Sequence, residues 1–214
     1  MNFNYEKDNK ERIPFEHYLE LYKKADPHEI SRRINVPFDV DKQVFDLWLL
    51  GTRYEISHPG YDITHIEDDA GYYPLEAINA QILILRYLLE GTLIPANGEF
   101  HTYKEMPWGE VYFKQFQGRC MMRLAFGFGN KLQTFANVME CMRASKLSYG
   151  DCSYEVEFLQ GLYLHFILWE GDDEFPPSAQ IQFSDNFPEA FQIEDMAFVC
   201  DITIGMMKAL EKIG

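Results

Sequence analysis

The sequence predicts a protein of the α+β class that folds as one compact domain over residues 1–214. No Pro/Gly/Ser-rich linker divides the chain, and 47% of its residues are hydrophobic, which is enough apolar surface for one large core. Hairpin patterns and long helical patterns occur in the same chain, which indicates a mainly antiparallel sheet packed by several helices. Disorder is expected only within residues 1–13.

The chain is expected to open with two helices. Leu19 and Tyr22 recur at helical spacing in residues 15–24. Asp26 and Pro27 then supply an N-cap and a first-turn proline for a second, short helix.

A hairpin is predicted after these helices. Residues 44–50 and 53–57 are rich in strand-forming side chains, and Gly51 separates them. The short segment Ile63 to Ile66 and an acidic turn at Glu67 to Gly71 come next.

A long buried helix is predicted from about residue 74 to residue 89. Pro74 starts it, and apolar side chains recur at helical spacing on more than one face, so the helix should be central. The main stripe consists of Leu75, Ile78, Ile82, Leu85 and Leu89, widened by Ala80, Leu83, Ile84 and Leu88. The sequence predicts a long structured loop over residues 91–110. Residues 111–145 are predicted to be mainly helical, with a break near residues 127–130.

A second hairpin is predicted from residues 153–158 and 162–169. The first segment alternates apolar and acidic residues, and the second is apolar at nearly every position, as expected of a central strand. A three-residue turn ending at Gly161 would pair Val156 with Leu164 and Glu155 with His165. Residues 179–183 should form another strand, and residues 193–213 a C-terminal helix whose stripe contains Ala197, Cys200, Ile204 and Met207.

The net charge of −15 argues against nucleic acid and anionic membranes as partners. No apolar run is long enough to span a bilayer, and the charged start of the chain does not resemble a secretion signal, so we expect a cytoplasmic protein. The cysteines lack C-x-x-C spacing and are expected to be reduced and mostly buried, without an iron–sulfur or zinc site. They are Cys120, Cys141, Cys152 and Cys200.

Motifs with a known mechanism are largely missing from the sequence. It has no complete dinucleotide loop, no Walker-type G-K-[ST] and no G-x-S-x-G elbow. His58 and His65 could approach across a hairpin, although an exposed polar pair is the commoner outcome. His165 is expected to be a core histidine paired with Glu155 rather than a general base. No cofactor is indicated, and the oligomeric state cannot be read from the sequence.

The first candidate for a site is the acidic run from Trp169 to Pro177. Four carboxylates, on Glu170, Asp172, Asp173 and Glu174, directly follow a predicted central strand. Clustered carboxylates raise one another's pKa and suit metal or acid/base chemistry, but the same run could be a solvated loop. It does not have the spacing of a calcium loop.

The second candidate lies between Phe100 and Arg119. Its amphipathic residues suit either a small-ligand pocket or a loop held over the core. The residues that we single out here are Tyr103, Lys104, Glu105, Trp108, Tyr112 and Arg119.

Three segments resemble an uncharacterised domain-of-unknown-function family, three-seven-eight-six, found in anaerobic bacteria and archaea. They are W-E-G-D-D-E-F-P-P-S-A-Q-I-Q-F from Trp169, P-L-E-A-I-N-A-Q-I-L-I-L-R-Y-L-L from Pro74, and Y-K-E-M-P-W-G-E-V-Y-F from Tyr103. The resemblance covers roughly residues 15 to 212. The resemblance implies that the gene lies near genes for corrinoid-dependent methyl transfer, as the genes of family members do. It also implies that some members carry an added iron–sulfur segment. This chain has dispersed cysteines and no D-x-H-x-x-G run for a corrinoid, so the implied link is indirect.

These patterns favour an accessory protein that binds a small molecule or a partner protein. Its expected site combines Tyr103, Glu105, Trp108, Tyr112 and Arg119 with the Trp169 turn. The alternative is an enzyme in which Glu170, Asp172 and Asp173 converge with Arg119 or a histidine in one cleft.

Overall fold

The computed structural model describes residues 8–67 and 74–213. Within them, nine strands form one antiparallel sheet in the order β4-β3-β2-β7-β8-β9-β5, with β1 beside β2 and β6 beside β7. The strands are β1 (Phe38–Asp39), β2 (Val44–Leu49), β3 (Thr52–Ser57), β4 (Ile63–Glu67), β5 (Phe100–Thr102), β6 (Ser145–Lys146), β7 (Cys152–Leu159), β8 (Leu162–Trp169) and β9 (Ser178–Ser184).

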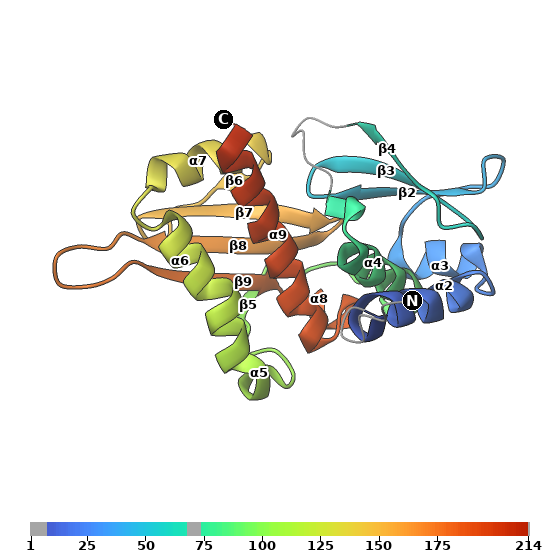
Figure 1. Ribbon diagram of the computed structural model, residues 1–214, viewed down its shortest axis with the longest axis horizontal. Helices are drawn as coiled ribbons and strands as arrows, with labels where there is room; N and C mark the ends of the chain where they lie inside the picture. The colour runs from blue at the N-terminus through green and yellow to red at the C-terminus, as the bar shows by residue number, and fades with distance from the viewer. Residues whose placement is uncertain (1–7, 68–73, 214) are drawn as a thin grey trace.

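Helices cover this sheet. They are η1 (Asp8–Arg12), α2 (Ile13–Tyr22), α3 (Pro27–Ile34), η2 (Pro74–Glu76), α4 (Ile78–Glu90), α5 (Gly109–Phe116), η3 (Gln117–Met121), α6 (Met122–Phe128), α7 (Leu132–Cys141), α8 (Phe187–Ala190) and α9 (Ile193–Ile213). Figure 1 shows α6 and α9 crossing in front of β7, β8 and β9, whereas α2, α3 and α4 gather beside β2 and β3. The buried apolar side chains form one continuous core, so the predicted α+β class and single compact fold are confirmed.

The two N-terminal helices form as expected. Asp26 accepts a hydrogen bond from the backbone N–H of His28 at 2.9 Å, which caps α3, and Asn35 ends that helix in the left-handed conformation. Of residues 1–13, for which disorder was expected, 1–7 lie outside the described residues and 8–12 form η1.

The long buried helix begins later than predicted. Pro74–Glu76 forms a 3₁₀ turn, Ala77 is extended, and the α-helix starts at Ile78. Its deepest face also differs, because the residues expected only to widen the stripe are the buried ones. These are Ala80, Leu83, Ile84 and Leu88, together with Leu85 and Tyr87.

The second hairpin has the predicted register. Val156 pairs with Leu164, and Glu155 pairs with His165. The turn is tighter than expected, because Leu159 pairs with Leu162 and a register shift between Glu157 and Leu159 absorbs the extra residue.

The loop predicted at 91–110 is not entirely irregular. It contains β5, a three-residue strand beside β9, and α5 begins within it at Gly109. The helical break near 127–130 is confirmed between α6 and α7.

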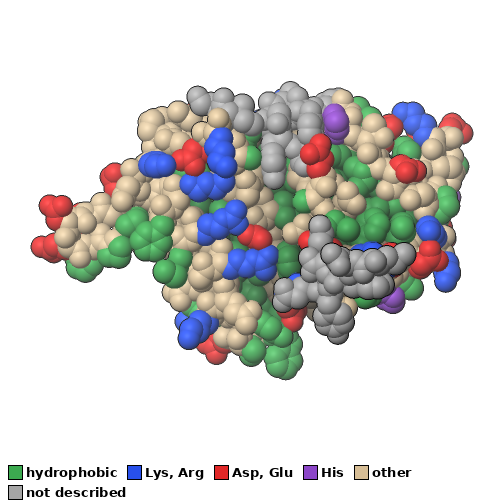
Figure 2. Space-filling model, viewed as in Figure 1, with side chains coloured by type: hydrophobic (Ala, Val, Ile, Leu, Met, Phe, Trp, Pro, Cys, Tyr) green, Lys and Arg blue, Asp and Glu red, His purple; other side chains and the backbone are tan. Residues whose placement is uncertain are grey.

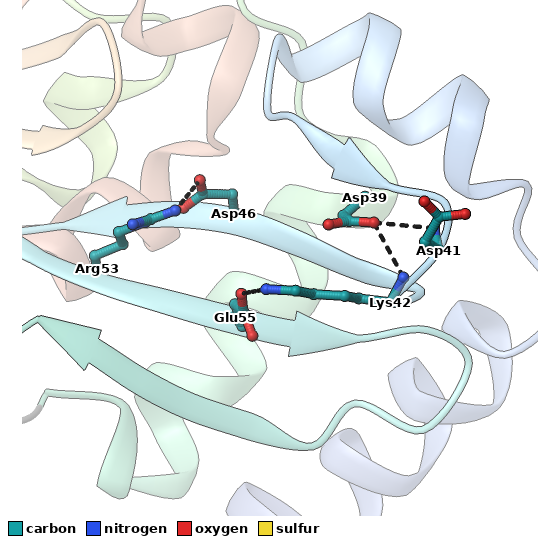
Figure 3. Close-up of polar contacts among 6 residues, drawn as sticks. All are labelled: Asp39, Asp41, Lys42, Asp46, Arg53 and Glu55. Carbon is teal, nitrogen blue, oxygen red and sulfur yellow. Dashed lines mark hydrogen bonds and ion pairs between the residues drawn. The ribbon is translucent and has the colours of Figure 1, made fainter.

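The outer face of β1, β2 and β3 is polar and internally paired. Arg53 makes two 2.8 Å contacts with the Asp46 carboxylate, and Lys42 lies 2.9 Å from Glu55 (Figure 3). Asp39 accepts hydrogen bonds from two backbone N–H groups in the turn that precedes β2. Asp46, Arg53 and Glu55 occupy the alternate strand positions that face away from the core.

The sheet has a narrow junction between β2 and β7. Only Leu49 and Leu159 are paired there within the described chain. Two further bonds reinforce the junction: the Leu50 N–H donates to Phe158 at 2.9 Å, and the Trp48 N–H donates to the Gln160 side chain at 3.2 Å.

Candidate functional site

A hollow of about 270 Å³ lies beside the outer edge of β9, and we call it the β9-edge cavity. β5 pairs only with residues 182–184 of β9, so residues 178–181 have no strand partner on that side within the described chain. The cavity occupies the space next to this open edge. Its walls come from the end of β5, α5, η3, β8 and β9, and consist of Thr102, Tyr103, Lys104, Phe113, Phe116, Met121, Trp169, Ala179, Gln180 and Ile181.

A tight turn opens this space by leading the chain away from β9. The Glu105 carboxylate accepts hydrogen bonds from the Thr102 hydroxyl and backbone N–H, both at 2.7 Å. These bonds hold the pKa of Glu105 below its usual range. Glu105 therefore shapes the cavity from outside and does not line it.

The start of α5 packs directly on this turn. A Cβ atom on Gly109 would lie 1.7 Å from the backbone oxygen of Tyr103, so only glycine fits there. Trp108, the residue before it, has a positive φ of 65° and a side chain that is 76% exposed. Trp108 points away from both the core and the cavity.

Two stacked rings form a wall of the cavity. Tyr103 and Phe116 lie 3.9 Å apart between centroids and are nearly parallel, at 6°. The Tyr103 hydroxyl donates to the backbone oxygen of Ile193 at 2.9 Å, and burial raises the pKa of this phenol. Tyr103 is thus held by a hydrogen bond at its hydroxyl and by the stacked Phe116 ring.

A second hollow, of about 160 Å³, shares this wall, and we call it the α5–α9 hollow. Arg119 lines it, 2.6 Å from Asp201 and with its guanidinium 4.2 Å from the Phe198 ring centroid. Tyr112 also lines it, and its hydrogen bond with Glu194 raises the pKa of the phenol. Lys and Arg side chains gather over α6 and α9 in this region (Figure 2).

The acidic run lies in the loop between β8 and β9. Asp172 accepts hydrogen bonds from the backbone N–H groups of Phe175 at 2.7 Å and Glu174 at 2.8 Å, which lower the pKa of Asp172. The Glu170 backbone N–H donates to Asp151 at 2.8 Å, which fixes the base of the loop. Glu170, Asp172, Asp173 and Glu174 are exposed, and acidic side chains mark the tip of the projecting loop in Figure 2.

The structure therefore divides the predicted site residues into groups. Tyr103 and Trp169 meet in the β9-edge cavity, while Tyr112 and Arg119 lie in the α5–α9 hollow on the other side of the Tyr103 ring. Glu105, Trp108, Glu170, Asp172 and Asp173 line neither hollow.

Sequence reasoning missed Phe113, Met121 and Ala179 as cavity residues. Phe113 and Met121 appear in the sequence as ordinary helix residues, and Ala179 as an ordinary strand residue. These residues line a cavity because β5 ends at Thr102. The end of β5 could not be predicted, because a three-residue strand shows no periodic pattern.

The histidines do not form a metal centre in the described residues. His58 lies against the Tyr22 backbone oxygen at 3.1 Å, and His165 pairs with Glu155 at 3.1 Å, as predicted for a core histidine. No group of three or more His, Cys, Asp or Glu side chains within residues 8–67 and 74–213 could hold a metal ion. Over the same residues, no helix has the length and apolar character needed to cross a membrane.

The model of a family described as a domain of unknown function (DUF3786) matches residues 26–206. The chain belongs to this family. The match covers both hollows and the acidic loop, but omits α2 and the end of α9, so it is slightly shorter than expected from sequence motifs. No curated protein and no solved structure matches this DUF3786 protein.

Proposed function

We propose that this DUF3786 protein is an accessory binding protein and that the β9-edge cavity is its site. The observation that supports the proposal is the meeting of Tyr103 and Trp169 in one apolar hollow beside an unpaired strand edge. Ligand sites are concave, mostly apolar and edged by a few polar groups. Thr102, Lys104 and Gln180 supply such groups here.

The size and lining of the cavity favour one ring or one branched aliphatic group. Phe113, Phe116 and Met121 offer flat and deformable apolar surface. Trp169 is 37% exposed and can cover a bound group while its other side contacts solvent. The Lys104 ammonium lies 4.3 Å from the Phe113 ring centroid and adds a positive charge at the rim.

The alternative of a carboxylate enzyme has less support. It required Glu170, Asp172 and Asp173 to converge with Arg119 or a histidine. Asp172 instead closes a turn, and Arg119 pairs with Asp201. No specific observation favours this second function.

The setting that we propose is the cytoplasm of an anaerobe, in support of corrinoid-dependent methyl transfer. The family resemblance supplies the anaerobic and methyl-transfer parts of this proposal. The four free cysteines, of which Cys120, Cys152 and Cys200 are buried, are consistent with a reducing compartment. The partner would be a small molecule or another protein, and neither nucleic acid nor membrane is proposed.

Titration with indole, followed by amide chemical shifts in NMR, tests the site. We expect saturable shifts at Phe113, Met121 and Trp169. Trp169→Ala should weaken binding by about threefold to tenfold, because it removes one aromatic contact. Ala179→Leu should abolish binding, because Ala179 lines the cavity and the larger leucine side chain would fill the space for the ligand.

The matched control is Arg119→Ala, which changes the α5–α9 hollow and leaves the β9-edge cavity intact. Circular dichroism confirms that each variant is folded. Absence of shifts around the cavity, or equal weakening in Arg119→Ala, would show that the site is elsewhere.

A further inference from the structure

Residues 111–139 contain no acidic side chain. This stretch carries Lys114, Arg119, Arg123 and Lys131 but no Asp or Glu, although the whole chain has 34 acidic residues and a net charge of −15. It forms η3, α6 and most of α5 and α7. Lys and Arg side chains gather over α6 and α9 in Figure 2. The charge of this surface is therefore opposite in sign to the charge of the whole molecule.

Salt bridges between α6 and α9 hold these cations in place without neutralising them. Two carboxylates of α9 are each shared by two cations. The groups are Asp201 with Arg119 and Arg123, and Glu211 with Lys131 and Lys208. Four positive charges thus share two negative ones, which leaves an excess of positive charge. The side chains of Arg119 and Arg123 remain 40% and 39% exposed, so both can donate further hydrogen bonds.

Exposed apolar side chains accompany these cations on the outer face of the same helical run. Val111 is 70% exposed, Met122 is 49% exposed and Phe126 is 63% exposed. Met122 and Phe126 are four residues apart, and so are Arg119 and Arg123. Residues four apart are neighbours on a helix surface, so the two pairs form adjacent rows, one apolar and one basic. Aromatic residues, Met and Arg are the types enriched where proteins contact one another.

The charge of this surface distinguishes between the possible occupants. A second copy docked through the same surface would bring like charges together. An anionic membrane would attract the cations but would repel the rest of a chain whose net charge is −15. A single acidic helix can contact the positive surface alone, because exposed charges more than about 8 Å away are largely screened. Its apolar side chains, at helical spacing, would match the apolar row.

We propose that the outer face of α6, with its salt bridges to α9, binds an acidic amphipathic helix of a partner protein. The apolar side chains of that helix contact Met122 and Phe126. Its carboxylates face Arg119, Arg123 and Lys131. Because the salt bridges already hold the cations in place, fewer side chains have to be ordered on binding. None of these residues lines the β9-edge cavity, so the inference does not depend on the proposed function.

The test uses the full chain and a fluorescent, acetylated peptide of about 20 residues, long enough to be helical in water. The peptide carries leucine at helical spacing on one face and glutamate on both flanks. We expect saturable binding in fluorescence anisotropy, with amide shifts in NMR centred on Met122 and Phe126. Phe126→Ser and Arg123→Gln should each weaken binding by about threefold to tenfold, because each removes one side chain of the contact.

The matched controls change exposed residues on the side of β2 and β3. Val40→Ser alters an apolar side chain that is 56% exposed in the turn between β1 and β2, and Lys24→Gln removes an exposed cation after α2. Neither change should alter peptide binding. Circular dichroism confirms that all four variants are folded. Equal weakening by the controls would overturn the proposed location.

Every other outcome contradicts the proposal. A peptide of the same composition in scrambled order keeps the charge and loses the apolar face, and equal binding of it would mean that charge alone is recognised. If the chain sediments with phosphatidylglycerol vesicles but does not bind the peptide, the occupant is a membrane. If the chain alone forms dimers that Phe126→Ser abolishes, a second copy covers the face. Absence of binding to any of these probes would also overturn the proposal, whatever indole does at the β9-edge cavity.

Discussion

Gly109 is the residue on which the geometry of the cavity depends most directly. Its missing side chain allows the first turn of α5 to contact the backbone oxygen of Tyr103. Any Cβ atom at this position requires α5 to move away from the turn that ends β5.

We therefore expect Gly109→Ala to destabilise the protein by several kcal/mol, about 3 or more, because backbone must move to relieve the clash. Urea unfolding measures the effect. Gly118→Ala is the matched control, since a Cβ atom there meets nothing within 4 Å and alanine favours a helix. Similar losses in both variants would contradict the steric explanation.

Asp195 is a buried carboxyl group whose charge is costly. Burial raises the pKa of Asp195 to about 6, even though the Arg86 guanidinium lies 2.7 Å away and acts in the opposite direction. Desolvation therefore outweighs the ion pair. The folded protein binds a proton at this site at higher pH than the unfolded chain does.

The contribution of Asp195 to stability should thus be least favourable above pH 6 and should improve as the pH falls toward 4. Relative to Asp195→Asn, which cannot titrate, the parent protein should gain about 1 kcal/mol between pH 7 and pH 5. Urea unfolding of both proteins at each pH measures this difference. A loss of relative stability over that interval would reverse the assigned direction.

Asn186 connects three elements that are distant in sequence. Its side-chain amide donates to the backbone oxygens of Ile94 and Gly161, both at 2.9 Å, and its oxygen accepts from the Ser184 hydroxyl at 2.7 Å. The side chain is fully buried. It holds the loop before β5 and the β7–β8 turn against the start of α8.

Asn186→Ala should cost about 2 to 4 kcal/mol, because it leaves the buried Ser184 hydroxyl without its acceptor and removes the donor to two part-buried carbonyl groups. Asn137→Ala provides the control, since Asn137 is exposed on α7 and bonds only to Gln133 within the described contacts. Thermal unfolding compares the two, and a loss in Asn137→Ala as large as that in Asn186→Ala would be evidence against this role.

Sequence periodicity predicted the elements that are long or strictly patterned. The register of β7 and β8 was predicted correctly from the alternation within β7 and the position of the turn that ends at Gly161. β5 was missed because its three residues are too few to show a period, and its existence depends on β9.

The candidate site was predictable only where a local sequence pattern indicated it. Aromatic composition indicated both Tyr103 and Trp169, but no local pattern could reveal that Arg119 and Trp169 line different hollows that share the Tyr103–Phe116 stack. The acidic run was correctly located after a central strand, yet its orientation is set by turn bonds at Asp172 that only the fold reveals.

At the scale of the whole molecule, the narrow junction at Leu49 and Leu159 divides the sheet into two bonded groups. Strands β1 to β4 form one group, and β5 to β9 form the other. Each group has extensive internal pairing, whereas little backbone bonding joins them.

Native-state hydrogen exchange in rising denaturant should therefore resolve two sets of amides with different opening free energies. Tyr54 and Ile56 report on the first set, and Val156 and Phe166 on the second. Convergence of all four on a single opening free energy would mean that side-chain packing across the junction makes the molecule one cooperative unit.

The shared ring wall between the two hollows also has an energetic consequence. Tyr103 and Phe116, which stack on each other, line both the β9-edge cavity and the α5–α9 hollow. Any displacement of the rings on one side changes the volume available on the other. A ligand that moves these rings from one hollow would change the affinity of the other, and the coupling free energy would be the same whichever hollow filled first.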